Sequence, residues 1–125
     1  MTSVLNVDTI ADAAGTGAVA LTKQSAAKAW VRFELVGTLS TIGSFNISSI
    51  DDLGTGAGRP NHTNNMSAAD YSLVGGTALN AAHAFSEHAA GALNITSQHR
   101  VTARNDAGTT LDADMLCSTI FGDLA

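Results

Sequence analysis

The sequence predicts a mainly β protein, an antiparallel β-sandwich or a small β-barrel with an extended N-terminal arm. The chain has 125 residues with 14 Thr and 12 Gly, but only two Lys and two Glu, the residues on which exposed helices normally draw. Several short runs alternate between apolar and polar side chains, which is the strand period. Turn signals separate these runs at a spacing of roughly ten residues, as in sandwiches and barrels.

The first 26 residues form the predicted arm. Residues 5–10 alternate like a short strand, the glycine-containing segment 13–17 is a turn signal, and residues 18–22 can return as another strand. Neither run has enough bulky side chains to fold alone, so the arm needs a partner surface. We therefore expect residues 1–26 to anchor to or intertwine with neighbouring subunits, and residues 27–125 to form the β domain.

Residues 28–35 make the clearest predicted strand. Val31, Phe33 and Leu35 alternate with polar positions and should face the core. The opposite face carries the next candidate residues, which we predict to lie at an interface between subunits because interfaces are enriched in Trp and Arg: Trp30, Arg32 and Glu34.

The next alternating run, residues 44–50, predicts a second strand with Phe45 and Ile47 on one face. Ile50 is out of phase, which predicts a bulge or a strand end near residues 48–49. Residues 51–56 then combine Asp with Gly and predict a turn.

The rest of the chain predicts a loop and three further strands. Residues 57–69 contain the only proline and are predicted to be a loop. Residues 75–92 are alanine-rich and fit either one or two helical turns or an irregular surface loop. The other predicted elements are a short strand at 71–74, a polar strand at 94–102, a turn at 105–108, and a central strand at 113–121 that is apolar on both faces.

Charge and composition narrow the classes of partner. The formal net charge is −5 and no basic stripe is present, so we expect no nucleic-acid binding. No apolar run reaches the length that spans a bilayer, and the N-terminus does not resemble a signal peptide, so we expect synthesis in a cytoplasm without membrane insertion. Only 33 residues are bulky and apolar, whereas 22 are Ala, so burial against identical copies is an obvious source of stability.

Several segments resemble tail-fibre-like virion proteins of tailed bacteriophages. Residues 28–33, Lys-Ala-Trp-Val-Arg-Phe, resemble the Lys-Ala-Trp-Val-x-Phe opening of such proteins, and residues 6–11 and 21–27 resemble their lead-in. Residues 44–56 resemble their Ser-Phe-Asn-Val-Ser-Ser-Ile strand and the Gly-Thr-Gly turn after it, and residues 104–122 resemble their closing hairpin.

The resemblance implies a virion structural protein with a β-rich fold and a homotrimeric assembly. It implies a place on the exterior of the phage tail or capsid, contact with other virion proteins through the arm, and synthesis in the bacterial host cytoplasm. A host surface glycan or protein is a further partner compatible with it. Two departures favour a short ornament over a long fibre: the insertion at 57–65 contains Pro60, and no long shaft follows residue 125.

We therefore expect a short tail fibre or tail-tip spike module, with a capsid decoration (cement) or head-fibre protein as the alternative. A soluble carbohydrate-binding β-sandwich is a third class. Loops on rigid scaffolds commonly carry recognition, so the 57–69 loop supplies the candidate surface-recognition residues Arg59, Asn61, His62 and Asn64.

No pattern of catalytic or cofactor-binding residues stands out, and we expect no cofactor, no metal and no enzymatic activity. The four histidines are at positions 62, 83, 88 and 99, a spacing that favours surface residues over a metal site. The acidic pairs at 51–52 and 112–114 fit turns better than a calcium loop. Glu34 and Glu87 are the only glutamates, and no Gly-x-Ser-x-Gly motif occurs.

Overall fold

A computed structural model describes residues 26–78, 84–86 (backbone only) and 94–125. Within these residues all regular structure is β-strand, in two antiparallel sheets that do not close into a barrel, which confirms the predicted fold class. The arm predicted for residues 1–26 lies outside the described residues except for Ala26. The strands are β1 (Ala29–Glu34), β2 (Ser40–Phe45), β3 (Ile47–Asp52), β4 (Ala57–His62), β5 (Ser72–Ala78), β6 (Ala84–Ser86), β7 (Val101–Arg104) and β8 (Met115–Phe121).

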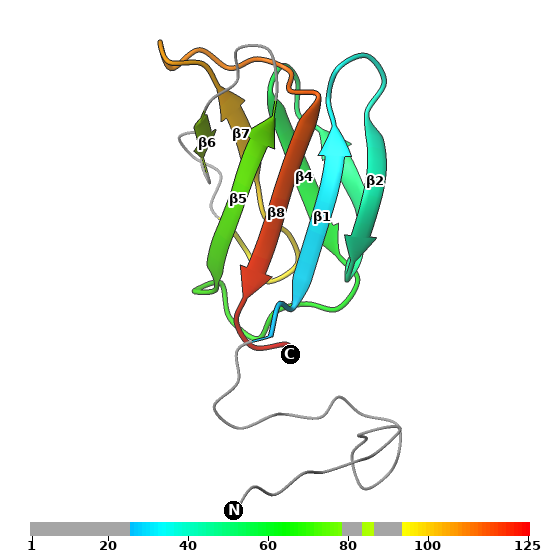
Figure 1. The fold of residues 1–125 in the computed structure, drawn as a ribbon. Helices are drawn as coiled ribbons and strands as arrows, with labels where there is room; N and C mark the ends of the chain where they lie inside the picture. Colours follow the sequence, from blue (N-terminus) through cyan, green and yellow to red (C-terminus); the bar gives the residue numbers. More distant parts are fainter. Residues whose placement is uncertain (1–25, 79–83, 87–93) are drawn as a thin grey trace, which may run out of the picture.

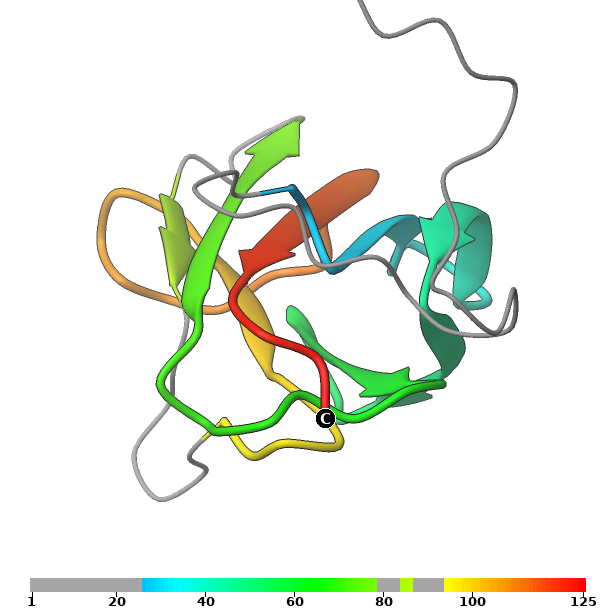
Figure 2. The same ribbon diagram turned by 90° about the horizontal axis from the view of Figure 1, so that it is seen from below.

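The first sheet has the strand order β2-β1-β8-β5 and the second β3-β4-β7-β6. In Figure 1 the first sheet faces the viewer, with β4 and β7 behind it. Seen from below in Figure 2, the two sheets form opposite walls. The alternating side chains of the two inner walls fill the space between them, as in other sandwiches.

Strand β1 has the predicted alternation. Val31, Phe33 and Leu35 are buried, and Trp30 and Arg32 are exposed on the other face. In β8 the even-numbered residues Leu116, Ser118 and Ile120 point into the core, and the odd-numbered residues are half-buried on the outer face. The prediction that β8 is central is confirmed, because it pairs with both β1 and β5.

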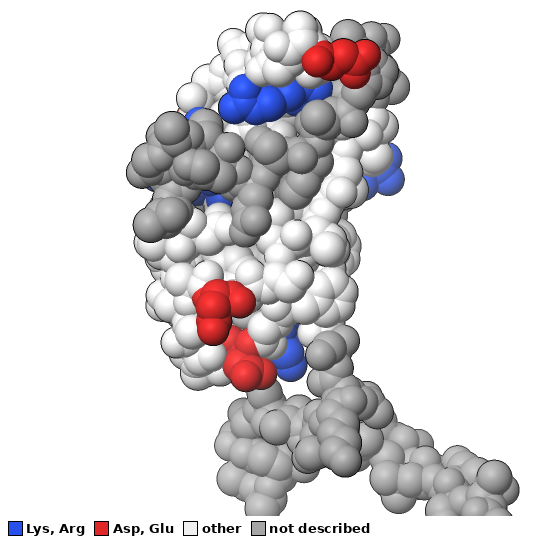
Figure 3. All heavy atoms as spheres, turned by 90° about the vertical axis from the view of Figure 1, so that its left-hand side faces the viewer, with Lys and Arg blue, Asp and Glu red and all other residues white. Residues whose placement is uncertain are grey.

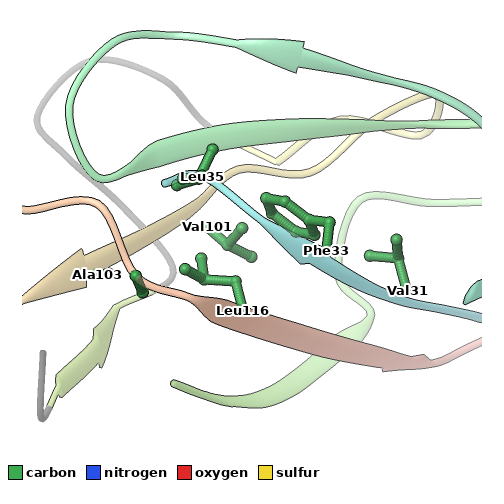
Figure 4. Packing of buried hydrophobic residues seen from close by; sticks show 7 residues of the cluster. Val31, Phe33, Leu35, Val101, Ala103 and Leu116 are labelled. Carbon is green, nitrogen blue, oxygen red and sulfur yellow. The ribbon is translucent and has the colours of Figure 1, made fainter. Parts of the chain in front are cut away.

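Two clusters of buried apolar side chains make up the core. The larger cluster combines both sheets, as the close-up in Figure 4 shows, and consists of Val31, Phe33, Leu35, Val101, Ala103, Ala113 and Leu116. The smaller cluster lies at the end of the sandwich where the chain enters β1, and consists of Ala29, Met66, Tyr71 and Ile120.

The prediction of one strand over residues 44–50 is wrong, because the chain changes sheets at Asn46. This residue has a left-handed conformation with φ of 56°, so β2 ends in the first sheet and β3 begins in the second. Its side chain donates to the carbonyls of Lys28 and Asn64, each at 3.0 Å, and accepts from the Asn64 amide at 2.7 Å. Phe45 and Ile47 therefore do not share a face. The predicted irregularity near residues 48–49 is confirmed by a register shift between β3 and β4.

The prediction of a loop over residues 57–69 is wrong for its first half, which is strand β4. Pro60 is tolerated because of the direction in which it points. Its carbonyl accepts from the His99 amide at 3.1 Å, so its nitrogen also points toward the His99 side and away from β3. The β3–β4 ladder consequently loses no hydrogen bond at Pro60, which is opposite Ile50.

The structure confirms two of the predicted turns. The turn at 51–56 is confirmed: Asp52 accepts from the Gly54 amide at 2.8 Å, and Gly54 and Gly56 have positive φ. The turn at 105–108 is confirmed by a 2.9 Å bond from the Gly108 amide to the Asn105 carbonyl.

Strand β5 extends past the predicted 71–74 to Ala78. The described parts of the uncertain stretch 75–92 are therefore strand, in β5 and β6, and the rest lies outside the described residues. Of the predicted strand 94–102 only the end belongs to β7, because residues 95–98 form a tight turn.

Candidate functional site

The outer face of the first sheet carries a row of apolar side chains. Trp30 on β1 is paired with Phe45 on β2 and with Thr119 on β8, and Thr119 is paired with Val74 on β5. These four residues form a row across all four strands, which we call the outer row. Phe45 is 53% exposed, Trp30 41% and Val74 50%. Large apolar side chains that are this exposed and contiguous are typical of a surface that contacts another molecule.

The neighbouring row has glycine at both of its ends. Arg32 is paired with Gly43 on one side and with Cys117 on the other, and Cys117 is paired with Gly76. The Trp30 indole lies over Gly43, because a Cβ added there would be 3.3 Å from the ring. The absence of a side chain at Gly43 thus lets the indole lie close to the backbone of β2.

The predicted interface residues Trp30, Arg32 and Glu34 all lie on this outer face, at alternate positions of β1. Their role in an interface remains a prediction. On the side of the molecule shown in Figure 3, which includes β5, the charged side chains occur in scattered groups and not as a continuous stripe.

The predicted recognition loop is not a single loop. Arg59 and Asn61 lie on strand β4, where Arg59 pairs with Asp51 at 2.7 Å and Asn61 donates to the Ser49 hydroxyl at 3.0 Å. The Arg59 hydrogen bonds lower the pKa of Asp51. Asn64 alone lies in the exposed segment after β4. The fourth member, His62, is buried, so this set does not form a common recognition surface.

Instead, His62 belongs to a chain of hydrogen bonds inside the sandwich. Its Nδ1 is 2.9 Å from the Thr96 carbonyl, and its Nε2 is 3.0 Å from Nδ1 of His99. Nε2 of His99 is 2.9 Å from the Ser118 hydroxyl. We call His62, His99 and Ser118 the histidine chain. It links β4 of the second sheet to β8 of the first.

The direction of every hydrogen bond in the histidine chain follows from its end. The Thr96 carbonyl only accepts, so His62 must carry its proton on Nδ1 and, when neutral, accept on Nε2. His99 must then donate from Nδ1 and accept on Nε2, and the Ser118 hydroxyl must donate. When both rings are neutral, this single arrangement of hydrogens gives every ring nitrogen of the histidine chain a hydrogen-bond partner.

The same atoms stand in the relation of nucleophile, base and orienting group that serine hydrolases use. Hydrolysis also needs a substrate to reach the hydroxyl, and Ser118 and His99 are each only 1% exposed. Ser118 is moreover in the middle of β8, between the two neighbouring strands of its sheet. The arrangement as it stands therefore joins the sheets and does not present a nucleophile.

Both histidines of the chain favour the neutral form. Burial lowers the pKa of His99 to about 3, with a smaller contribution from nearby His62. Burial also lowers the pKa of His62, although its hydrogen bond to Thr96 acts in the opposite direction. Removing an imidazolium from water without a compensating charge explains both directions.

The expectation that the histidines are surface residues is wrong for His62 and His99, while His83 and His88 lie outside the described residues. A period-two pattern in the sequence could have indicated that His62 and His99 are buried. His62 follows Gly58 and Pro60, and His99 precedes Val101 and Ala103, always on the core-facing side. In each case the polarity of the ring obscured the alternation.

Comparisons with known proteins assign no family, because no family model, curated protein or solved structure matches the chain. Within the described residues, no three His, Cys, Asp or Glu side chains are grouped so as to hold a metal ion. The described part of the chain also has no helix with the length and apolarity needed to cross a membrane.

Proposed function

We propose that this chain is a non-enzymatic structural protein of a bacteriophage virion, a short tail fibre or tail-tip spike module that assembles as a homotrimer through the outer face of its first sheet. The observation that carries the assembly is the exposed outer row, in which Phe45 and Trp30 are adjacent and Thr119 separates Trp30 from Val74. The virion role is supported by the sequence resemblance described above.

A second copy of the same chain is the proposed occupant of this face. Arg32 and Glu34 are two residues apart on one face of β1, so each copy offers one cation and one anion beside the apolar row. In a closed ring of copies, Arg32 of each copy can thus pair with Glu34 of the next copy. The interface then has no net excess of either charge. Such complementarity favours identical partners over unrelated ones.

The proposal includes attachment to other virion proteins through residues 1–26 and contact with a host surface glycan or protein. A capsid decoration or head-fibre protein is the alternative location, and it uses the same assembly face. Immunogold labelling of intact particles distinguishes them: label at the tail supports the fibre or spike, and label over the capsid supports decoration. Absence of label from purified particles would contradict both.

The neighbouring aromatic rings of Trp30 and Phe45 favour one other function, a carbohydrate-binding sandwich. Exposed aromatic rings offer an apolar surface against which a sugar ring can stack. This candidate predicts a monomer that binds glycans through the outer row, whereas the virion proposal predicts that the row is covered by other copies.

Sedimentation equilibrium of the full chain tests the assembly. We expect a trimer, and a shift toward monomer in the double variant Trp30→Ser/Phe45→Ser. Val36→Ser is the matched control, because Val36 is similarly exposed but lies in the β1–β2 connection, outside the outer row. A chain that is monomeric at high concentration, or a trimer unaffected by the double variant, would contradict the proposed interface.

A further inference from the structure

We propose that the histidine chain is an acid-operated latch, which holds the turn at residues 95–98 against the sandwich at neutral pH and releases it in mild acid while both sheets persist. This inference is independent of the proposed virion role. It assigns a conformational task to two buried titratable groups that the assembly face does not use.

Hydrogen bonds from His62, Met66 and Tyr71 hold the turn against the sandwich. Besides the bond from its ring to the Thr96 carbonyl, the His62 backbone amide donates to the Ser97 carbonyl at 2.8 Å. The Met66 amide donates to the Thr96 carbonyl at 2.9 Å. The Tyr71 hydroxyl lies 3.1 Å from the Ile95 carbonyl and 2.9 Å from the Gln98 carbonyl, so that its single proton is shared between them. The turn therefore depends on the position of His62 and its neighbours.

An added proton disturbs the hydrogen bonds of the closed histidine chain. On His99 Nε2 it would force the Ser118 hydroxyl to change from donor to acceptor. On His62 Nε2 it would oppose the N–H of His99 across 3.0 Å unless the hydrogens of His99 and Ser118 also rearranged. A proton on each ring would leave two cations in contact, a state that burial makes unfavourable.

No anion in the described structure offsets such a charge. The 95–98 turn contributes the Thr96 carbonyl, which contacts Nδ1 of His62. From the segment before β5 comes the Tyr71 ring, edge-on with its centroid 6.0 Å away. From β8 comes the Ser118 hydroxyl, and the charged Arg100 follows His99 in the chain. Opening the turn brings His62 into contact with water more readily than His99, because His62 is already 6% exposed whereas His99 is 1% exposed.

The tautomers give the first test and need no substitution. Long-range nitrogen–proton NMR correlations at neutral pH should show both His62 and His99 protonated on Nδ1. A proton on Nε2 of either ring would overturn the one-directional arrangement and with it the latch.

Hydrogen exchange gives the second test. Exchange rates, corrected for the intrinsic effect of pH, are compared between amides of the latch and amides at the other end of the sandwich. The latch amides are those of His62 and Met66, and the reference amides are those of Leu35 and Ala103, which donate to Ala113 and Gly56. Release of one histidine with an ordinary pKa of about 6.5 raises the opening equilibrium about tenfold between pH 7.5 and pH 5.5.

We therefore expect the latch amides to lose about tenfold in protection over that interval through a local opening that low concentrations of urea do not accelerate. Exchange of the reference amides needs global unfolding, so it should be accelerated by urea and follow the fall in global stability. Latch amides that urea accelerates as strongly as the reference amides would mean global unfolding and would overturn local release, as would no loss of protection at the latch amides. In His62→Gln/His99→Gln the pH dependence should disappear, whereas the control His83→Gln/His88→Gln should retain it. The reverse pattern would overturn the assignment, and the NMR test remains decisive if the first double variant does not fold.

Discussion

The ring of Phe33 on β1 lies so close to Gly58 on β4 that a Cβ at Gly58 would be 2.7 Å from ring atom Cε2 and 2.8 Å from Cζ. The two residues belong to opposite sheets, so this contact limits how closely the sheets approach in the larger core cluster. Glycine at position 58 is thus a packing requirement of the phenyl ring and not a requirement of the backbone.

We expect Gly58→Ala to lower the free energy of unfolding by about 1–3 kcal/mol, because the buried ring must shift or the sheets must separate. Gly76→Ala is the matched control: it is also in a strand, and its added Cβ would meet only Cys117 Sγ at an ordinary 3.7 Å. Urea denaturation of both variants is the measurement. A Gly58→Ala protein as stable as Gly76→Ala would contradict the tight contact.

A second glycine comparison separates backbone strain from collision. Gly54 and Gly56 both have positive φ, but a Cβ at Gly54 meets nothing within 4 Å, whereas one at Gly56 would be 2.7 Å from backbone atoms of Leu111. Gly54→Ala should cost only the left-handed conformation, about 1–2 kcal/mol, and Gly56→Ala should cost clearly more. Thermal denaturation ranks the two variants, and equal losses would contradict the collision at Leu111.

The hydroxyl of Ser118 tests the direction of the histidine chain energetically. Ser118→Ala removes the donor to His99 Nε2 and leaves a buried acceptor without a partner, which should lower the free energy of unfolding by about 1–3 kcal/mol. Ser72→Ala is the control and should change the free energy of unfolding less, because Ser72 is exposed and lies in β5 outside the outer row. If alanine at 118 were neutral at pH 7, the bond to His99 would not be part of the ground state.

Global stability should also depend on pH through the same residues. The folded pKa values of His62 and His99 are lowered, so the unfolded chain binds more protons below its ordinary histidine pKa of about 6.5. Their contribution is complete above about pH 6.5 and declines as the pH falls, for His99 down to its folded pKa of about 3. For His99 the slope between these two pH values should approach about 1.4 kcal/mol per pH unit, and His62 adds a contribution of the same sign.

Urea midpoints measured between pH 8 and pH 4 test this sign. The midpoint should be flat above neutrality and fall through the slightly acidic range. A midpoint that increased as the pH fell from 7 to 5 would show that protonation favours the folded state, contrary to the burial of these rings.

Alternation alone was enough to predict much of the first sheet. Val31, Phe33 and Leu35 alternate with polar residues over a run that no glycine or proline interrupts, so their face was unambiguous. The run at 113–121 is apolar enough to require neighbours on both sides, and β8 has them.

The corner at Asn46 could not be predicted in the same way. Residues 44–50 continue an alternating pattern across it, and the left-handed conformation depends on partners far away in the sequence, at Lys28 and Asn64. The strand at Pro60 could not be predicted for a related reason. A proline costs a strand a hydrogen bond only if its nitrogen faces a paired strand, and the direction of the nitrogen is known only from the register.

Only part of the candidate site could be predicted from the sequence. The shared face of Trp30, Arg32 and Glu34 follows from period two, but the outer row needs the pairing of Trp30 with Phe45, which depends on the β1–β2 register. The histidine chain joins residues 37 and 19 positions apart, and no local pattern reports such contacts.

The central position of β8 constrains how this protein matures during synthesis. β1 and β5 have no pairing with each other and meet only through β8, which follows both of them in the chain. A nascent polypeptide can form the β1–β2 and β3–β4 hairpins as it emerges, but the first sheet stays divided until residues 115–121 have left the ribosome. The first sheet is thus completed only after β8 has been made, and a chain that lacks β8 leaves the edges of β1 and β5 unpaired and exposed to aggregation.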